Sequence, residues 1–195
     1  MAAGRNHHAL GLVTVAQVAE FFERQPRIMQ LLETVDTLGL PDCWIGAGLL
    51  RNAVWDELHG IRTPLSSASD VDVIYFDQSA VEPGRDSVIE QQLSGMLPGV
   101  PWSVHNQARM HERNGDPPYA DTEDALRYWP ETATAIAARL DGTQVALLTP
   151  FGIEDLVGLI VRPTPAFRAK MDQYRARIAA KNWPVTWPHL TVMGA

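Results

Sequence analysis

The sequence predicts a fold of the α/β (α+β) class, in which helices flank one β-sheet. Three β-like runs begin near residues 43, 70 and 102, and segments with helical spacing separate them. Two further runs, 133–140 and 143–149, flank Asp141-Gly142, and this dipeptide between β-like runs is a strong signal for a β-hairpin. The chain is therefore expected to form a single domain over 1–195.

Two helices are predicted before the first strand. Thr14 and Gln17 form a capping box that starts a helix over 14–24. Pro26 has the place of a first-turn proline in the second helix, whose apolar residues recur at helical spacing until Gly39. We expect N-terminal helices over 14–38, after frayed residues 1–8.

The core sheet is predicted over 43–149, and C-terminal helices and a tail over 150–195. Within the core, we expect strands at 43–45, 70–77 and 102–110, helices at 49–59 and 84–97, and loops at 61–69 and 111–121. Asp121 is expected to cap a short helix that runs to Trp129. Helices near 152–161 and 165–182 and an extended tail from Trp183 close the chain.

Charge and composition exclude several classes of protein. The formal net charge of −7 argues against a nucleic-acid partner, because affinity for a phosphate backbone comes from Lys and Arg. No apolar run reaches the roughly 20 residues of a membrane span, so a cytoplasmic protein is expected. The one cysteine, Cys43, cannot form an internal disulfide and is predicted to be a small buried apolar residue. The sequence does not indicate an oligomeric state.

A glycine turn precedes the helix at 49–59. Gly46 and Gly48 would let the backbone approach a phosphate, and the helix would direct its free N–H groups at the same place. Arg51, one turn into that helix, would reach an anion or a nearby carboxylate. Taken alone, the turn is better explained as a tight connection that is packed for shape.

Asp70 and Asp72 form the second candidate feature. Residues i and i+2 of a strand point to the same face, so both carboxylates would face one divalent ion, Mg²⁺ or Mn²⁺. The alternative is that one aspartate caps the strand and the other is solvated. The apolar run 73–76 weakens that alternative, because a carboxylate in a core strand needs a partner.

The order of these features carries a resemblance. GAGLLRN at 46–52, followed after about twenty residues by DVDVI at 70–74, resembles the nucleotidyltransferase superfamily, which includes DNA polymerase β, CCA-adding enzymes and poly(A) polymerases. The arrangement is most similar to the CCA-adding pattern G-G-x-V-R-D…L-G…D-x-D. Over roughly 25–190 the chain also resembles a family of small bacterial nucleotidyltransferase-like proteins.

The resemblance implies a mixed sheet with helices packed against it, and Mg²⁺-dependent transfer of a nucleotidyl group from an NTP with release of pyrophosphate. It implies that Gly46 and Gly48 hold the triphosphate, that Arg51 and Asn52 belong to the nucleotide site, and that the two aspartates bind metal. Arg109, in the strand predicted at 102–110, is a further candidate contact to nucleotide or acceptor, with a polar strand face as an equal alternative.

Two departures from the superfamily pattern are visible. Ala47 replaces the second glycine of the CCA-type turn. Many superfamily members also place a third carboxylate on a later strand, whereas 102–110 contains no Asp or Glu. His105 is a candidate base, although a surface histidine is favoured, and Glu131 is a candidate third carboxylate, although a role in holding a backbone turn is favoured.

The sequence thus predicts a nucleotidyltransferase that moves an NMP group to an unidentified hydroxyl-bearing small molecule or protein. The alternative is a catalytically inactive nucleotide-binding or interaction module on the same fold.

Overall fold

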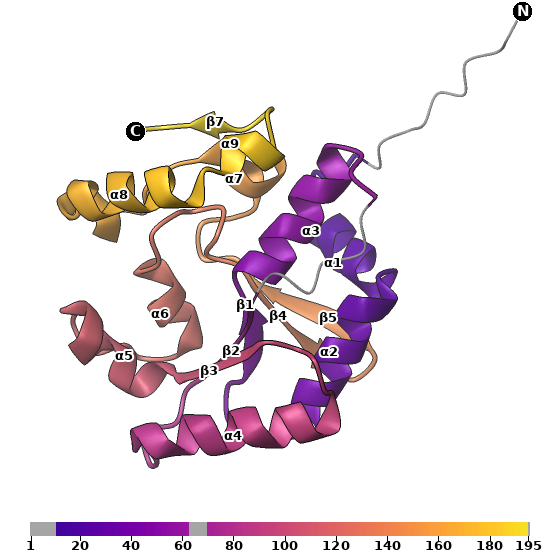
Figure 1. Cartoon of the computed structure of the whole chain (residues 1–195), viewed down its shortest axis with the longest axis vertical. Helices are drawn as coiled ribbons and strands as arrows, with labels where there is room; N and C mark the ends of the chain where they lie inside the picture. Colours follow the sequence, from indigo (N-terminus) through magenta and orange to yellow (C-terminus); the bar gives the residue numbers. More distant parts are fainter. Residues whose placement is uncertain (1–10, 63–69, 195) are drawn as a thin grey trace, which may run out of the picture.

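A five-stranded mixed sheet forms the centre of the molecule, for which a computed structural model describes residues 11–62 and 70–194 (Figure 1). The strand order is β3-β2-β1-β4-β5, in which β2 and β3 are parallel and the other neighbours are antiparallel. The strands are β1 (Trp44–Gly46), β2 (Val71–Tyr75), β3 (Trp102–Asn106), β4 (Ala137–Asp141) and β5 (Gln144–Leu148). The predicted mixed α/β class is confirmed.

Local signals set the two N-terminal helices and the hairpin as expected. Thr14 and Gln17 form both halves of the capping box of α1 (Val15–Glu23), and α2 (Pro26–Asp36) begins at its proline. Gly142 has a positive φ of 63° at the turn between β4 and β5. These features depend on neighbours in sequence, and for this reason the sequence predicts them well.

The remaining helices surround the sheet and extend above it. They are α3 (Gly48–Leu58), α4 (Pro83–Met96), α5 (Gln107–Asn114), α6 (Thr122–Arg127), α7 (Glu154–Val157), α8 (Met171–Lys181) and α9 (Trp183–Thr186), with a 3₁₀ helix η1 (Ala166–Ala169). A second, two-stranded sheet pairs β6 (Ile160–Val161) with β7 (Thr191–Val192). As predicted, Asp121 caps α6 by accepting a hydrogen bond from the backbone N–H of Asp124.

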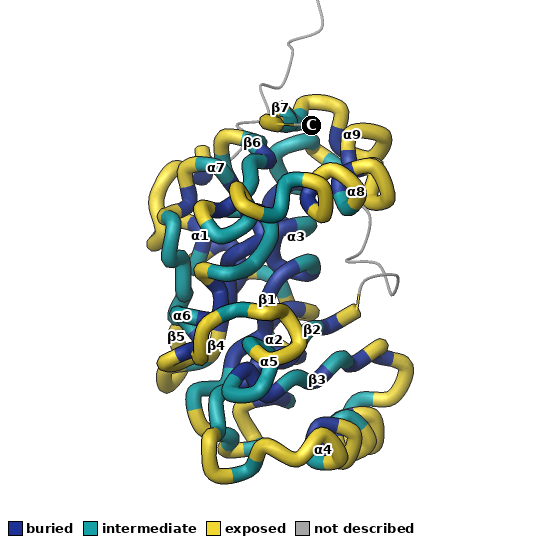
Figure 2. Tube along the Cα trace, turned by 90° about the vertical axis from the view of Figure 1, so that its left-hand side faces the viewer, coloured by how far each residue is buried: buried dark blue, intermediate teal, exposed yellow. Residues whose placement is uncertain are grey.

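The two faces of the five-stranded sheet are covered differently. One face packs against α1 to α4 and carries the main core, and Figure 2 shows the buried residues concentrated in the strands and α3. The other face carries Trp44 and Ile74 and is covered by Leu126 of α6 and by Trp129. We call this second face the α6 face. Its cover leaves polar residues at the start of β2 and β3 half-exposed.

The strand predicted at 102–110 is shorter than expected, and the loop predicted at 111–121 is partly helical. β3 ends at Asn106, whose side chain accepts a hydrogen bond from the backbone N–H of Ala108. Asn106 is therefore the N-cap of α5, and the chain turns into a helix at Gln107.

The C-terminal predictions also need correction. The helix expected at 152–161 is only α7, because Gly158 ends it and Leu159 has a positive φ of 57°. The helix expected at 165–182 is interrupted at Lys170 between η1 and α8. The tail is not fully extended, since Trp183 begins the short helix α9.

Tertiary packing explains the conformation of this tail. The Trp183 and Trp187 rings pack against the Trp55 ring of α3, with centroid distances of 5.6 and 5.2 Å. The segment 1–8, for which fraying was predicted, and nearly all of the predicted loop 61–69 lie outside the described residues. Among the described helices, none combines the length and apolarity that a membrane span requires.

Candidate active site

The turn between β1 and α3 adopts an unusual backbone conformation. Ala47 has φ 55° and ψ −124°, a region that residues with a Cβ seldom occupy, and such a conformation costs about 1–3 kcal/mol. Its N–H donates to the Ile136 carbonyl at 3.0 Å, and its side chain is buried. This backbone conformation explains why the CCA-type pattern has a glycine where this chain has Ala47.

Gly46 and Gly48 have different surroundings. A Cβ built at Gly46 would lie 2.8 Å from the Trp129 ring and 3.2 Å from Ile74 Cδ1. A Cβ at Gly48 would meet only Arg51 Nη2, at 3.9 Å. Gly46 is therefore needed for packing under Trp129, whereas the space beside Gly48 is open.

The first turn of α3 begins at Gly48 and has no side-chain cap. The first N–H groups of an α-helix have no partner within the helix, and together with the helix dipole they favour an anion. The open space beside Gly48 leaves room for a phosphate to approach these groups.

Asp72 lies in β2 between two neighbouring strands, opposite Gly46 of β1 and Ser103 of β3. Burial raises the pKa of its carboxyl group. The His105 side chain and a hydrogen bond from Ser103 oppose this rise, whereas the negative charge of Asp70 adds to it. Asp70 is exposed and immediately precedes β2. The structure thus places Asp72 beside the glycine turn, with Asp70 close enough to influence its carboxyl group.

Arg51 and Asn52 lie beside this turn, within α3. Arg51 is 4% exposed, and its guanidinium donates to Thr134 Oγ1 at 3.0 Å and to Asn52 Oδ1 at 2.8 Å. The guanidinium carbon lies 4.8 Å from the ring centroid of Trp55 and 4.3 Å from that of Trp183. Burial lowers the pKa of Arg51 to about 10, so the side chain still carries a positive charge at neutral pH. No salt bridge in the described part of the chain includes Arg51, and its Nε is buried without a partner.

Glu131 does not join the aspartates. It is fully buried, and its carboxylate accepts a hydrogen bond from Arg177 Nε of α8 at 2.7 Å. Arg177 in turn lies over the Trp183 ring, at 5.7 Å. Glu131 therefore ties α8 to the segment before β4, whereas the sequence favoured a role in holding a backbone turn.

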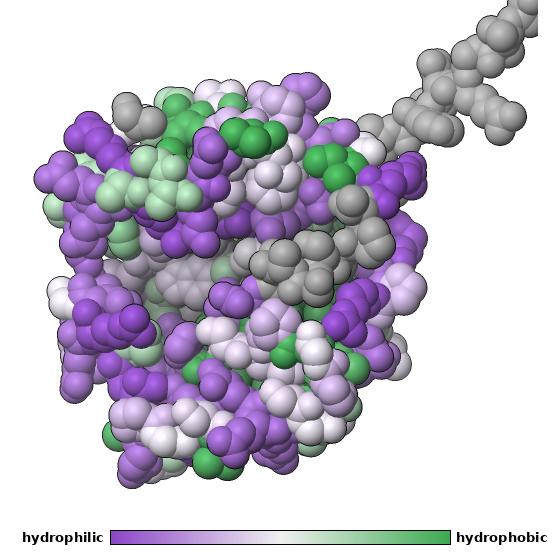
Figure 3. Space-filling view, viewed as in Figure 1, coloured by the Kyte–Doolittle hydropathy of each residue, from purple (hydrophilic) through white to green (hydrophobic). Residues whose placement is uncertain are grey.

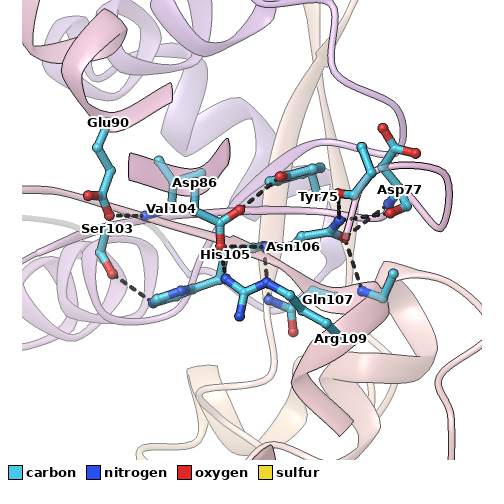
Figure 4. A network of polar contacts seen from close by, with 12 residues as sticks. Tyr75, Asp77, Asp86, Glu90, Ser103, Val104, His105, Asn106, Gln107 and Arg109 are labelled. Atoms are coloured by element: carbon cyan, nitrogen blue, oxygen red, sulfur yellow. Dashed lines mark hydrogen bonds and ion pairs between the residues drawn. The ribbon is translucent and has the colours of Figure 1, made fainter. Parts of the chain in front are cut away.

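Arg109 lies away from the glycine turn, in α5 rather than in a strand. Its guanidinium forms an ion pair with the buried Asp86 of α4 (Figure 4). Asp86 also accepts a hydrogen bond from Tyr75, at the end of β2. The structure places Arg109 in a polar network at the opposite end of β2 from Asp72.

Sequence reasoning gave little weight to three polar residues near Asp72. Ser103 and His105 lie on the α6 face of β3, and Ser103 Oγ lies 3.1 Å from His105 Nε2. Lys181, the last residue of α8, lowers the pKa of Asp72 through its positive charge. The period of two in β3 indicates the first pair, but no local pattern relates Lys181 to the site.

The two aspartates fit a divalent metal ion that binds together with a phosphate ligand. Mg²⁺ commonly takes one or two protein carboxylates and completes its shell with phosphate oxygens and water. In the described part of the chain, no group of three or more His, Cys, Asp or Glu side chains could hold a metal ion. The donor set therefore suits an ion bound with a nucleotide better than an ion held by protein alone.

The surface is hollowed on the side of the molecule where α8 lies above α5 and α6. Figure 3 shows this hollow between the C-terminal helices and the lower part of the molecule.

Comparisons with known proteins identify the family of the chain and its fold. The model of a family described as nucleotidyltransferase matches residues 33–192. A solved structure, described as an NMR structure that reveals a CCA-adding enzyme head domain, is 31% identical to the chain with a TM-score of 0.83. The match covers 95% of this chain and 100% of that one. No curated protein matches the chain at a significant level.

Two larger enzymes share the fold at lower identity. The Thermotoga maritima CCA-adding enzyme in complex with tRNA is 17% identical with a TM-score of 0.56, and a CCA-adding enzyme in complex with CTP is 14% identical with a TM-score of 0.56. Each match covers 90% of this chain but only 42% or 43% of the enzyme. The family match over most of the chain, and the fold shared with a CCA-adding enzyme head domain, establish that this chain belongs to the nucleotidyltransferase family.

Proposed function

We propose that the chain is a Mg²⁺- or Mn²⁺-dependent nucleotidyltransferase that moves an NMP group from an NTP to a hydroxyl group of a small molecule or a protein. One observation carries the proposal: Asp72 lies opposite Gly46, two residues before the uncapped first turn of α3, and the exposed Asp70 lies two residues before Asp72. An anion site next to a pair of acidic metal ligands suits a metal-bound triphosphate.

Each residue group has a defined task in this proposal. The backbone N–H groups at the start of α3 bind phosphate oxygens, and the charge of Arg51 beside Gly48 strengthens that anion site. Asp70 and Asp72 would hold the divalent ion, which would supply positive charge to offset that of the phosphates and the leaving pyrophosphate. Asn52 orients the Arg51 guanidinium through their hydrogen bond.

The charge of the chain bears on the acceptor. One of the similar enzymes is complexed with tRNA, but this chain spans less than half of that enzyme. Its net charge of −7 disfavours binding to a long phosphate backbone. We therefore propose a small molecule or a protein as the acceptor, and a cytoplasmic location.

Release of pyrophosphate tests this function. Each of the four NTPs is incubated with the protein, Mg²⁺ or Mn²⁺, and a panel of hydroxyl-bearing small molecules and proteins. We expect release with at least one NTP, and loss of release in Asp70→Asn and in Asp72→Asn. Full activity in both variants would refute the assignment. Metal-dependent NTP binding without release of pyrophosphate for any acceptor would favour the alternative, an inactive nucleotide-binding module. The absence of Asp and Glu from β3 supports that alternative.

A further inference from the structure

The site contains a hydroxyl group of its own, on the strand next to Asp72. Ser103 is the register partner of Asp72 in the parallel pair of β2 and β3, and it is half-exposed on the α6 face. His105, two residues further along β3, lies on the same face, and Figure 4 shows its ring turned toward Ser103. Ser103 Oγ and His105 Nε2 are 3.1 Å apart.

This pair has the arrangement of a nucleophile and a base. A serine hydroxyl becomes reactive when a neighbouring side chain within hydrogen-bond distance can take its proton. Within the described residues, no other Ser, Thr or Tyr hydroxyl is hydrogen-bonded to a histidine ring. The pair also lies beside the carboxylate to which the proposed function assigns the metal ion.

Ser103 has a single hydroxyl proton, which it can donate to either Asp72 or His105. A hydrogen bond from Ser103 to Asp72 lowers the pKa of that carboxyl group. When Asp72 is engaged by another ligand, the imidazole of His105 is the acceptor that remains. The contact that the structure shows, between Ser103 Oγ and His105 Nε2, is the one that would activate Ser103.

We propose that Ser103 is itself an acceptor of the nucleotidyl group, with His105 as the residue that takes its proton. The proposal rests on the proposed function, because the NTP is held by Asp70, Asp72 and the start of α3. Ser103 Oγ attacks the α-phosphorus of the NTP and forms an O–P bond. The bond from that phosphorus to the oxygen bridging to the β-phosphate breaks, pyrophosphate leaves, and the hydroxyl proton moves to His105 Nε2.

Mass spectrometry of the whole chain tests this inference directly. The protein is incubated with Mg²⁺ and each NTP, at concentrations that titration calorimetry has shown to saturate each variant. We expect a mass increase of one NMP per chain, equimolar pyrophosphate, and fragment ions that place the adduct on Ser103. Ser103→Ala should carry no adduct, and Ser94→Ala, at an exposed serine of α4, should be labelled like the unchanged protein.

The role of His105 has its own readouts. His105→Gln should slow the labelling of Ser103 by about 10²- to 10⁴-fold, the usual contribution of a positioned general base. The chemistry of the adduct separates the two residues, because a phosphodiester on serine survives mild acid whereas a phosphoramidate on histidine is cleaved. An acid-labile adduct, or one that persists in Ser103→Ala, would overturn the proposal.

The remaining outcomes separate this inference from the proposed function. If the protein binds an NTP in a Mg²⁺-dependent manner but gains no mass, Ser103 is not an acceptor, and the proposed function stands. If it binds no NTP, the proposed function fails and this inference fails with it.

Discussion

The two ends of strands β2 and β3 use similar residues for different purposes. Asp72 and Ser103 lie near the start of these strands, and Tyr75 and Asn106 lie at their ends, three residues or roughly 10 Å further along. At the far end, the buried Asp86 accepts hydrogen bonds from Tyr75 and the Asn106 backbone, and it is ion-paired with Arg109 (Figure 4).

The far end is a closed network. Asn106 is fully buried, and its side chain makes hydrogen bonds to the backbone of Asp77, Ala80 and Ala108. The end of the strands that carries Asp72 and Ser103 is open, because no cationic side chain is bound to Asp72 in the described structure. Burial of Asp72 without such a partner raises its pKa. A closed polar network stabilises a fold, whereas an open one is available to a ligand.

The largest expected effect on activity comes from a substitution at the open end. Asp72→Asn should lower the rate of pyrophosphate release by at least about 10²-fold, because it removes charge that holds the metal ion against the phosphates. The unfolding midpoint should not fall, because the substitution also removes a partly buried carboxylate with a raised pKa. Rate assays and urea titration of the same samples measure both quantities. Full activity would contradict the site, and a large loss of stability would show that Asp72 supports the fold.

The matching change at the closed end should have the opposite profile. Asp86→Asn should lower the free energy of unfolding by about 2 kcal/mol, because it breaks a largely buried ion pair. NTP affinity should stay within a factor of two or so, as Asp86 lies at the other end of the strands. Asp172→Asn, at a fully exposed carboxylate, serves as the control and should leave the free energy of unfolding unchanged. A loss of NTP binding in Asp86→Asn but not in the control would contradict the separation of the two ends, because both would then contribute to one site.

Substitutions of the two glycines in the turn should have smaller effects, and they separate a role in packing from a role in binding. Gly46→Ala should destabilise the fold by about 1–3 kcal/mol, because the new methyl group meets the Trp129 ring. Gly48→Ala should leave stability unchanged or raise it by up to about 1 kcal/mol, since alanine favours a helix. Its methyl group would instead occupy the open space and weaken NTP binding. Thermal melts and calorimetric titrations of both variants decide this, and equal stability losses would contradict the assignment.

The smallest effect is a dependence on pH. The pKa of Asp72 is raised above its ordinary value of 3.8, so the folded state binds this proton more tightly than the unfolded state. The contribution of Asp72 to stability is therefore most favourable below about pH 3.8 and declines as pH rises through the raised pKa. In the absence of metal, the urea midpoint of Asp72→Asn should rise relative to that of the unchanged protein as the pH increases through this window. A constant difference between the two would contradict the pKa shift.

Sequence and structure agree where local signals decide the conformation. The capping box at Thr14, the proline that starts α2 and the Asp141-Gly142 hairpin depend on near neighbours, and alternation in β2 places Asp72 on a defined face. The end of β3 was also encoded locally, by Asn106 as an N-cap, but a strand-like pattern concealed it.

Long-range contacts account for what the sequence did not predict. Glu131 meets Arg177 across 46 residues, and Arg51 stacks on Trp183 from another helix. The conformation of the C-terminal segment follows from such packing, and the effect of Lys181 on Asp72 arises only after α8 is in place. Spacing along the chain carries no information on these pairs.

The most direct measurement is a calorimetric titration with each of the four NTPs, with and without Mg²⁺, on the unchanged protein, Asp72→Asn and Asp86→Asn. We expect binding of at least one NTP that requires Mg²⁺, is lost in Asp72→Asn and is retained in Asp86→Asn. Absence of binding for all four NTPs, or equal binding in Asp72→Asn, would contradict the assignment of the open end of β2 and β3 as the nucleotide site.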